Sequence, residues 1–299
     1  MYQSGIVSGH AKAGIFIEAD VSHASKAQIQ QACVASLDKL NDLQQQFPEA
    51  ELGMTIGFGD QLWKSFNHPD EGTELKPFRP LGGGLAPATQ HDLMIHVQAL
   101  RYDVCFALSA AVIAAFGDTI HVADETHGHR LLQDRGMDGF VDGTENPKDD
   151  DVINVGIIPA DRPDAGGTYL MIQKYLHNLH TWDKAGITQQ ENSVGRSKQD
   201  NIEFEKENRL PDSHLGRVNL KKDGKTLEIV RRSLPFGTIS GEHGLLFCAY
   251  CNTLYNIETQ LLHMFGEFDG KTDLLLTHLS KAVSGAYYFA PSVERLRQL

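Results

Sequence analysis

The chain has 299 residues, of which 41% are hydrophobic and 22% are charged, so its composition is that of a globular protein with a large core or two ordinary domains. Its 39 acidic residues outnumber its 27 basic residues and give a net charge of −12. Nucleic acids and anionic membranes attract proteins that carry a positive field, so this charge argues against both as partners.

The start of the chain, "MYQSGIVSGHAKAG", lacks the basic-then-apolar pattern of a secretion signal, and no stretch of the sequence is long enough to span a bilayer. We therefore expect a cytoplasmic protein. The four cysteines, Cys33, Cys105, Cys248 and Cys251, are too few for a disulfide framework. Cys248 and Cys251 have the spacing of half a zinc site, but no second pair accompanies them. We expect them to be small apolar core residues.

Hydrophobic periodicity predicts the order β-α-β-β-α-β for the first half of the chain. In the expected strands apolar residues alternate with small or polar ones, and in the expected helices they recur on one face. The expected elements are a strand at 13–19, a helix at 25–47, strands at 51–59 and 92–100, a helix through Val104 and Leu108 that ends at Gly117, and a strand at 119–125. This order is that of the ferredoxin-like unit. The stretch from Gly82 to Gly84 lacks the Gly-Lys-Ser/Thr of a phosphate loop and predicts a turn.

The second half has the same order of elements, less clearly marked. The expected elements are a strand at 167–178, a helix at 182–196, a long irregular stretch at 197–220, strands at 227–234 and 244–250, a helix at 254–266 and a closing strand at 286–291. We therefore predict an α+β fold of two ferredoxin-like domains with antiparallel sheets. The polar, proline-containing connection at 143–166 suggests a division into residues 1–150 and 151–299.

Three short stretches carry residues that are candidates for chemistry. In "GFVDGTENP" (139–147), Asp142 stands before a glycine, which is also ordinary turn chemistry. In "PDSHLGRVNL", His214 has no neighbouring ligand residues of a non-haem metal site, but a single histidine is enough for haem. A surface or core histidine is the alternative. In "EIVRRSLPFG", Arg231 alternates with Ile229 and should share its apolar face, unless this is an edge strand with two solvated arginines.

Together, "GFVDGTENP", "SHLGRVNL" and "IVRRSLPFG", followed by "GLLFCAYC" and "YYFAPS", resemble the dye-decolourising peroxidase family, with bacterial B-type members as the nearest match. The resemblance runs over nearly the whole chain. It implies a cofactor, haem b (iron protoporphyrin IX), bound in the second of two ferredoxin-like domains, while the first domain contributes a distal aspartate.

The resemblance also implies roles for individual residues. The family's Gly-x-x-Asp-Gly motif falls on Gly139, Asp142 and Gly143, which makes Asp142 the distal acid. His214 is then the axial iron ligand, and Arg231 is the distal arginine. Further implied cofactor contacts are Ser233 at a distal position, Phe247 on the distal pocket wall, Arg196 near a haem propionate, and Asp273 as the carboxylate that hydrogen-bonds the axial imidazole.

The implied activity is oxidation of dyes and other one-electron donors by hydrogen peroxide, through a ferryl intermediate. Arg231 beside Asp142 would keep the aspartate unprotonated, so that it can move the peroxide proton. Arg231 would also stabilise the departing oxygen. An acidic optimum is expected, and a surface tyrosine or tryptophan, such as Trp63 or Trp182, would relay electrons from bulky donors. Alternative functions on this fold are chemistry on chlorite or on porphyrin propionates, and non-enzymatic haem carriage.

The implied partners are hydrogen peroxide and small-molecule reductants, with no nucleic acid and no membrane. Family members commonly self-associate, so we expect a homodimer or a higher even oligomer. Some relatives carry an extension after the last strand that docks into an encapsulating shell. The chain ends at "SVERLRQL", soon after "YYFAPS", and no such extension is seen, so we expect no shell partner.

Overall fold

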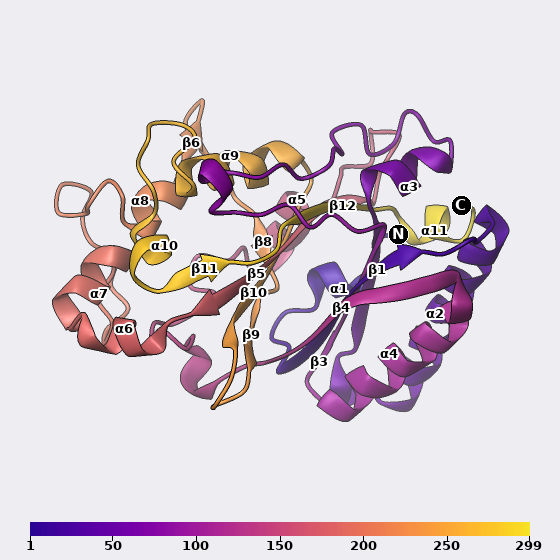
Figure 1. Cartoon of the computed structure of the whole chain (residues 1–299). Helices are drawn as coiled ribbons and strands as arrows, with labels where there is room; N and C mark the ends of the chain where they lie inside the picture. Colours follow the sequence, from indigo (N-terminus) through magenta and orange to yellow (C-terminus); the bar gives the residue numbers. More distant parts are fainter.

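The computed structural model describes residues 1–299, and two four-stranded antiparallel sheets form its centre (Figure 1). The first sheet has the order β2-β3-β1-β4 and consists of β1 (Ala13–Val21), β2 (Gly53–Phe58), β3 (Leu93–Ala99) and β4 (Ile120–His129). The second sheet has the order β12-β5-β10-β9 and consists of β5 (Thr168–His177), β9 (Leu234–Gly237), β10 (His243–Cys251) and β12 (Ala286–Ala290). Both orders are those of a ferredoxin-like unit, as predicted.

The two sheets are not separate, because they join at their edges. β12 pairs with β2 at Phe289 and Phe58, and β4 pairs with β9 at Gly128 and Phe236. These two contacts close the eight strands into a barrel. The periodicity of the sequence did not indicate this closure, since each junction is a single residue pair.

Short strands extend the sheet on the second unit. β8 (Val230–Arg231) pairs with β10, and β11 (Ser280–Ala282) pairs with β5. A separate hairpin consists of β6 (Lys221–Lys222) and β7 (Lys225–Thr226). The strand expected at 227–234 is therefore interrupted: after Arg231 the chain leaves the β8 ladder and resumes as β9.

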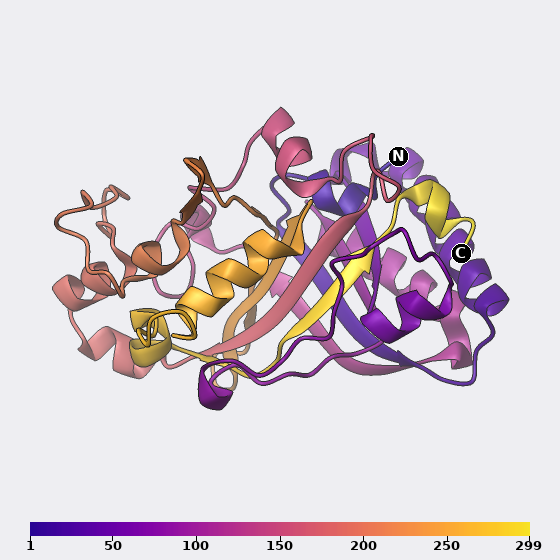
Figure 2. The same ribbon diagram turned by 90° about the horizontal axis from the view of Figure 1, so that it is seen from above.

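Helices cover the outside of the barrel and form two groups on opposite sides of it, one on each unit (Figures 1 and 2). The first unit has α2 (Lys26–Gln46) and α4 (Tyr102–Phe116), which pack on each other and on the first sheet. The second unit has α6 (Leu179–Lys184), α7 (Ile187–Val194), α8 (His214–Val218), α9 (Leu254–Met264) and α10 (Leu274–His278). Short helices lie elsewhere at α1 (Ser4–Val7), α3 (Asp60–Ser65), α5 (Asp150–Gly156) and α11 (Val293–Leu296).

The helices of the second unit differ from the sequence-based expectation in two places. The helix expected at 182–196 is broken into α6 and α7 at Gly186, whose φ of +75° no helix continues through. The stretch expected to be irregular at 197–220 contains α8, a helix of five residues whose first turn is capped by the Ser213 hydroxyl. The turn expected at Gly82 is present, as three consecutive glycines with positive φ.

α4 is apolar enough to pass for a membrane span, and one of its faces packs in the core of the first unit. The window Tyr102–Thr119 has a mean hydropathy of 1.3. Val104, Leu108 and Val112 on one face of α4 are fully buried against the first unit. Packing in the core therefore explains the apolar residues of this face, while about two-thirds of the window is not buried.

The inside of the barrel holds buried polar groups as well as apolar ones. Glu18 on β1 is 4% exposed and accepts a hydrogen bond of 2.6 Å from the Tyr288 hydroxyl on β12. Burial raises the pKa of Glu18 to about 7. Cys248 points into the barrel and Cys251 points to the opposite face of β10, so the two thiols cannot share a metal ion.

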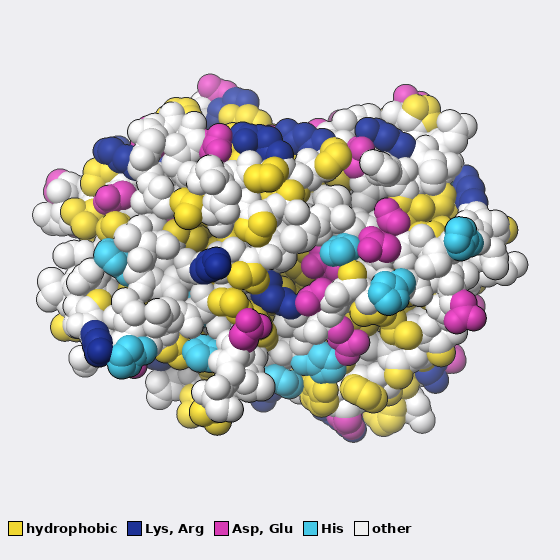
Figure 3. Space-filling model, viewed as in Figure 1, with side chains coloured by type: hydrophobic (Ala, Val, Ile, Leu, Met, Phe, Trp, Pro, Cys, Tyr) yellow, Lys and Arg dark blue, Asp and Glu magenta, His cyan; other side chains and the backbone are white.

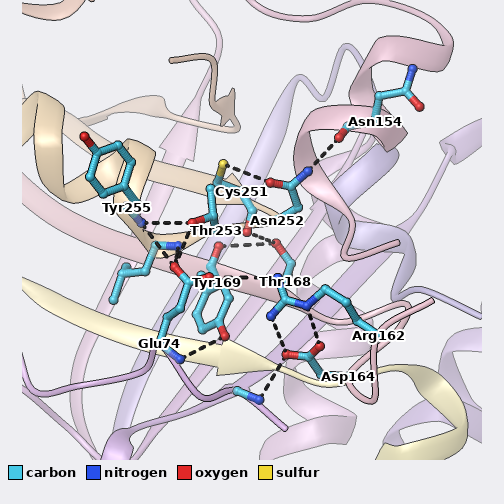
Figure 4. A network of polar contacts seen from close by, with 12 residues as sticks. Glu74, Asn154, Arg162, Asp164, Thr168, Tyr169, Cys251, Asn252, Thr253 and Tyr255 are labelled. Carbon is cyan, nitrogen blue, oxygen red and sulfur yellow. Dashed lines mark hydrogen bonds and ion pairs between the residues drawn. The ribbon is translucent and has the colours of Figure 1, made fainter. Parts of the chain in front are cut away.

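A loop of the first unit crosses to the second unit and caps α9 (Figure 4). One carboxylate oxygen of Glu74 accepts hydrogen bonds from the Thr253 hydroxyl at 2.7 Å and the Leu254 N–H at 2.9 Å. The Glu74 N–H donates to the Tyr169 hydroxyl. A carboxylate at a helix N-terminus satisfies free N–H groups and is favoured by the helix dipole. The first unit thus helps to fix α9, which forms part of a cavity wall.

Candidate functional site

The second unit encloses a cavity of about 530 Å³ on the outer face of its sheet. Strands β5, β8, β9 and β10 form one wall, helices α8, α9 and α10 form the other, and the loop 136–145 after β4 closes one end. Of the 36 lining residues, 17 are hydrophobic. A cavity that combines a large share of apolar side chains with convergent polar groups is typical of a cofactor site.

His214 lies at the first position of α8, on the wall of this cavity. Its Nδ1 atom is 2.7 Å from Oδ2 of Asp273, whose side chain is fully buried. The other oxygen of Asp273 accepts a bond of 2.8 Å from the Leu275 N–H and caps α10. A carboxylate only accepts, so Nδ1 carries the hydrogen and Nε2 keeps a free lone pair. This is the arrangement of a histidine prepared to bind a metal.

Asp142 reaches the same cavity from the loop after β4. Its N–H donates to the Asp134 carbonyl at 2.8 Å, and Gly139 and Gly143 on either side have φ of +86° and +80°. These values favour glycine. At Gly139 a side chain would also collide with Lys198. The glycines therefore shape this loop so that the Asp142 side chain lines the cavity.

Arg231 faces the cavity from β8, and the alternation of this strand explains why. Ile229 and Arg231 both line the cavity, whereas Val230 is packed inside the barrel. Arg232 is buried on that inner side, where it donates to the Ile6 carbonyl. The ion pairs of the cavity wall are Arg196 with Glu145 and Glu203, and His214 with Asp273. The side chains of Asp142 and Arg231 form neither ion pairs nor hydrogen bonds within the protein, so both remain available to a ligand.

Two family models match this chain. The model described as "Dyp-type peroxidase, N-terminal" matches residues 3–130, and the model "Dyp-type peroxidase, C-terminal" matches residues 133–295. The chain belongs to the Dyp-type peroxidase family. The two models divide the peroxidase at residues 131–132, so Asp142 lies in the part matched by the C-terminal model.

Individual relatives agree with this assignment. The dye-decolorizing peroxidase of Mycobacterium tuberculosis is 36% identical over 95% of this chain and 86% of that relative. A dye-decolorizing protein from V. cholerae has a TM-score of 0.93 and 41% identity, over 99% of both chains. A variant of Rhodococcus jostii RHA1 DypB in complex with heme has a TM-score of 0.92 and 31% identity, over 100% of this chain and 98% of the other. The protein is a haem peroxidase of the dye-decolourising type.

The residues of the peroxidase cavity fit haem. One histidine with a buried carboxylate behind it could supply the single protein ligand that haem iron needs. Nearly half of the lining residues are hydrophobic and can pack against the faces of a porphyrin. Arg196 also lines the cavity, where its positive charge could suit a propionate. Its guanidinium contacts the Glu145 carboxylate at 2.5 Å and the Asn201 carbonyl at 2.8 Å.

The two remaining candidates, and one residue that sequence analysis missed, also lie at this cavity. Phe247 and Ser233 both line the cavity. The Ser233 hydroxyl accepts a hydrogen bond of 3.2 Å from the Cys248 N–H. Asp138, four residues before Asp142, lines the cavity as well, and burial raises the pKa of Asp138 to about 6. In the sequence Asp138 precedes a glycine as Asp142 does, and nothing local distinguishes the two carboxyl groups.

Both tryptophans are buried, so neither is a surface relay. Trp182 lies behind the cavity wall, where its indole N–H donates to the Asp138 carbonyl at 2.9 Å and its ring is 6.4 Å from that of Phe140. Trp63 is packed in the core of the first unit. Among the exposed aromatic side chains are Tyr102 and Tyr255.

Proposed function

We propose that His214 would be the protein ligand that holds haem iron in this peroxidase, and that Asp142 and Arg231 would assist cleavage of the peroxide O–O bond. The observation that supports this proposal most strongly is the set of side chains that line one cavity. A histidine held by a buried carboxylate shares that cavity with a carboxylate and a guanidinium that have no partner in the protein.

When bound, haem supplies the iron chemistry by which peroxide is reduced and donors are oxidised. The protein's part is proton transfer and charge stabilisation. Asp142 accepts the proton from one peroxide oxygen and delivers it to the other, which leaves as water. Arg231 stabilises negative charge on that departing oxygen, because its donors are already oriented toward the cavity. Asp273 holds the His214 ring with Nε2 directed at the cavity.

The free side chains of Asp142 and Arg231 favour peroxide activation over haem carriage. A carrier has no use for an acid and a cation left unpaired beside its ligand. Stopped-flow absorbance of the haem-loaded protein after addition of peroxide tests this directly. A rapid change in the Soret band is expected in the wild type, and Asp142→Asn and Arg231→Ala should each slow it while haem stays bound. An unchanged Soret band in the wild type would support carriage instead.

Three further residues complete the proposed cofactor site. Arg196 binds a haem propionate, in competition with its present partner Glu145. Ser233 and Phe247 form the wall on the distal side. The B-type assignment is likewise part of the proposal. His214→Ala should bind haem more weakly than the wild type in a titration of the apoprotein, and unchanged haem content and spectrum would contradict the axial role.

The proposed assembly is a homodimer or a higher even oligomer, and α4 supports it. This helix presents Phe106, which is 54% exposed, together with the exposed Ala107, Ala110 and Ala114. An exposed apolar helix face of this kind is often an interface. Sedimentation analysis should find an even oligomer that Phe106→Asp shifts toward the monomer. A monomeric wild type would contradict the proposal.

We further propose a cytoplasmic enzyme that works without nucleic acid, membrane or shell partners. All four cysteines are free and buried, which suits a reducing compartment. Acidic and basic side chains are intermixed over much of the face in Figure 3, so no broad basic surface is present there. A related peroxidase from Mycobacterium smegmatis is encapsulated. In this chain Leu296 and Leu299 are buried, which makes them unavailable to a shell protein.

The proposed domains are the two ferredoxin-like units. We expected the division at residue 150, with the first unit contributing Asp142. The pairing of β4 in the first sheet and the start of the second family model at residue 133 support a division just after β4 instead. Limited proteolysis that cuts first between His129 and Asp142 would support this earlier boundary, and first cuts near residue 150 would support the later one.

A further inference from the structure

Asn146 joins the loop that carries Asp142 to the strand that carries Arg231. The Arg231 N–H donates to Oδ1 of Asn146 at 2.8 Å, and Nδ2 of Asn146 donates to the Arg231 carbonyl at 3.0 Å. One side-chain amide therefore pairs with both backbone polar groups of Arg231, as a neighbouring strand would. The Arg231 carbonyl also accepts a bond of 3.1 Å from Nη1 of Arg232, whereas the Arg231 N–H has its side-chain partner in Asn146.

The position of β8 explains why such a clamp is needed. β8 is two residues long and lies at the edge of the sheet, where it pairs with β10 on one side only. Its other edge has free N–H and C=O groups, which a strand must satisfy or leave to water. Asn146 occupies that edge at Arg231. The free side chain of Arg231 adds nothing to the anchoring. The backbone position of this residue therefore depends on β10, on the Arg232 guanidinium at its carbonyl and on Asn146, and Asn146 is the contact that comes from the loop of Asp142.

The chain between Asp142 and Asn146 is short and folded. The Asn146 N–H donates to the Gly143 carbonyl at 3.1 Å, which closes a tight turn. Within this turn the Thr144 hydroxyl accepts from Asn201 at 2.9 Å, and Glu145 pairs with Arg196. Successive residues of the loop thus dock on different parts of the cavity wall. Only Asn146 docks on the strand of the arginine.

We propose that Asn146 is a positioning residue that sets the separation between the Asp142 carboxylate and the Arg231 guanidinium. The inference rests on the roles proposed above for these two residues. Proton transfer and charge stabilisation act on the two oxygens of one small molecule, so both groups must be placed within a fraction of an ångström. A misplacement of about 1 Å can reduce a rate on the order of a hundredfold.

The test compares Asn146→Ala with Asn252→Ala in the haem-loaded protein. Asn252 is a matched control: its Nδ2 donates to the Asn154 carbonyl at 2.8 Å, so it also ties the segment after Asp142 to the second unit, but away from the cavity. The first readout is the dissociation constant for fluoride from the Soret shift, because a small anion in the cavity takes a hydrogen bond from a well-placed Arg231. The second is the stopped-flow rate of reaction with peroxide.

We expect Asn146→Ala to weaken fluoride binding and to slow the peroxide reaction, each by about tenfold, with haem content unchanged. Asn252→Ala should change neither readout. In an Arg231→Ala background, Asn146→Ala should add less than about a twofold further change, because residues that act through one group are not additive. Asn146→Asp, which keeps the acceptor for the Arg231 N–H but loses the donor to its carbonyl, should shift both readouts in the same direction as Asn146→Ala.

The outcomes separate this inference from the proposed function. If Arg231→Ala weakens fluoride binding but both Asn146 variants leave it unchanged, the positioning role is wrong and the role of Arg231 stands. If Asn146→Ala and Arg231→Ala have fully multiplicative effects, Asn146 acts elsewhere and the inference is also wrong. If Arg231→Ala itself changes neither readout, the proposed role of Arg231 fails, and the positioning role fails with it.

Discussion

Replacing Asp273 by Asn should weaken haem binding by a predictable amount. Asp273 uses both carboxylate oxygens: one accepts from Nδ1 of His214 at 2.7 Å and the other from the Leu275 N–H at 2.8 Å. Asparagine is almost isosteric but has one acceptor oxygen, and its NH₂ group can only donate. If the amide oxygen faces either N–H, its NH₂ group faces the other partner in a fully buried site. The variant must therefore lose a bond that the aspartate makes, or the His214 ring must move its hydrogen to Nε2 and lose the lone pair that would bind iron.

The size of the effect follows from the kind of bond that is lost. A hydrogen bond to a charged group contributes about 1.5–3 kcal/mol, and removal of such a partner from a metal-binding histidine typically costs about 10–100-fold in affinity. We therefore expect Asp273→Asn to bind haem about 10–100-fold more weakly. Asp273→Ala should lose this and also about 1 kcal/mol of the α10 cap.

Titration of the apoprotein with haem, followed at the Soret band, measures the affinity. Thermal unfolding of the apoprotein separates the loss of the α10 cap from the loss at His214. An Asp273→Asn protein with wild-type haem affinity and an unchanged Soret spectrum would show that the contact between His214 and Asp273 does not prepare the histidine for iron.

Three further predictions concern the scaffold around the site. Folded Glu18 keeps its proton up to its pKa of about 7, whereas the unfolded chain loses it near 4.5. Stability from this group is therefore present below pH 4.5 and falls by about 3 kcal/mol as the pH rises to 7. Denaturant unfolding of Glu18→Gln against wild type across this range should show the fall only in the wild type, and parallel pH profiles would contradict it. Glu74→Ala removes the carboxylate at the N-terminus of α9, where the Thr253 hydroxyl remains, and should lower the unfolding free energy by about 1–2 kcal/mol. A variant that melts with the wild type would show that the loop does not hold this helix. Gly139→Ala meets a φ of +86°, while the end of the flexible Lys198 side chain can move aside, so it should cost about 1–2 kcal/mol and expose the loop to protease. An unaffected melting curve would remove the backbone explanation for this glycine.

The regular elements of the first unit could be predicted because their patterns are local. In α2, Ile29, Leu37 and Leu40 are buried as their spacing indicates. α8 was not predictable, because its five residues are held by the Ser213 cap and by packing against α9. The closure of the barrel was not predictable either, since it depends on two single-residue contacts between strands far apart in the sequence.

The candidate site shows the same division between local and distant information. Asp142, His214 and Arg231 were found from short motifs that resemble a known family, while periodicity alone indicated only that Arg231 shares a face with Ile229. The contact between His214 and Asp273 joins residues 59 positions apart. The clamp of Asn146 on Arg231 spans 85 positions. Contacts of this kind are set by tertiary structure and leave no periodic trace in a single sequence.

The most direct test of the account is a crystal structure of the haem-loaded protein. We predict that the iron is bonded to Nε2 of His214, with Asp273 on Nδ1, and that the Asp142 carboxylate and the Arg231 guanidinium lie together over the other face of the porphyrin. An iron bonded to a different residue, or Asp142 and Arg231 on the same side of the haem as His214, would contradict the account.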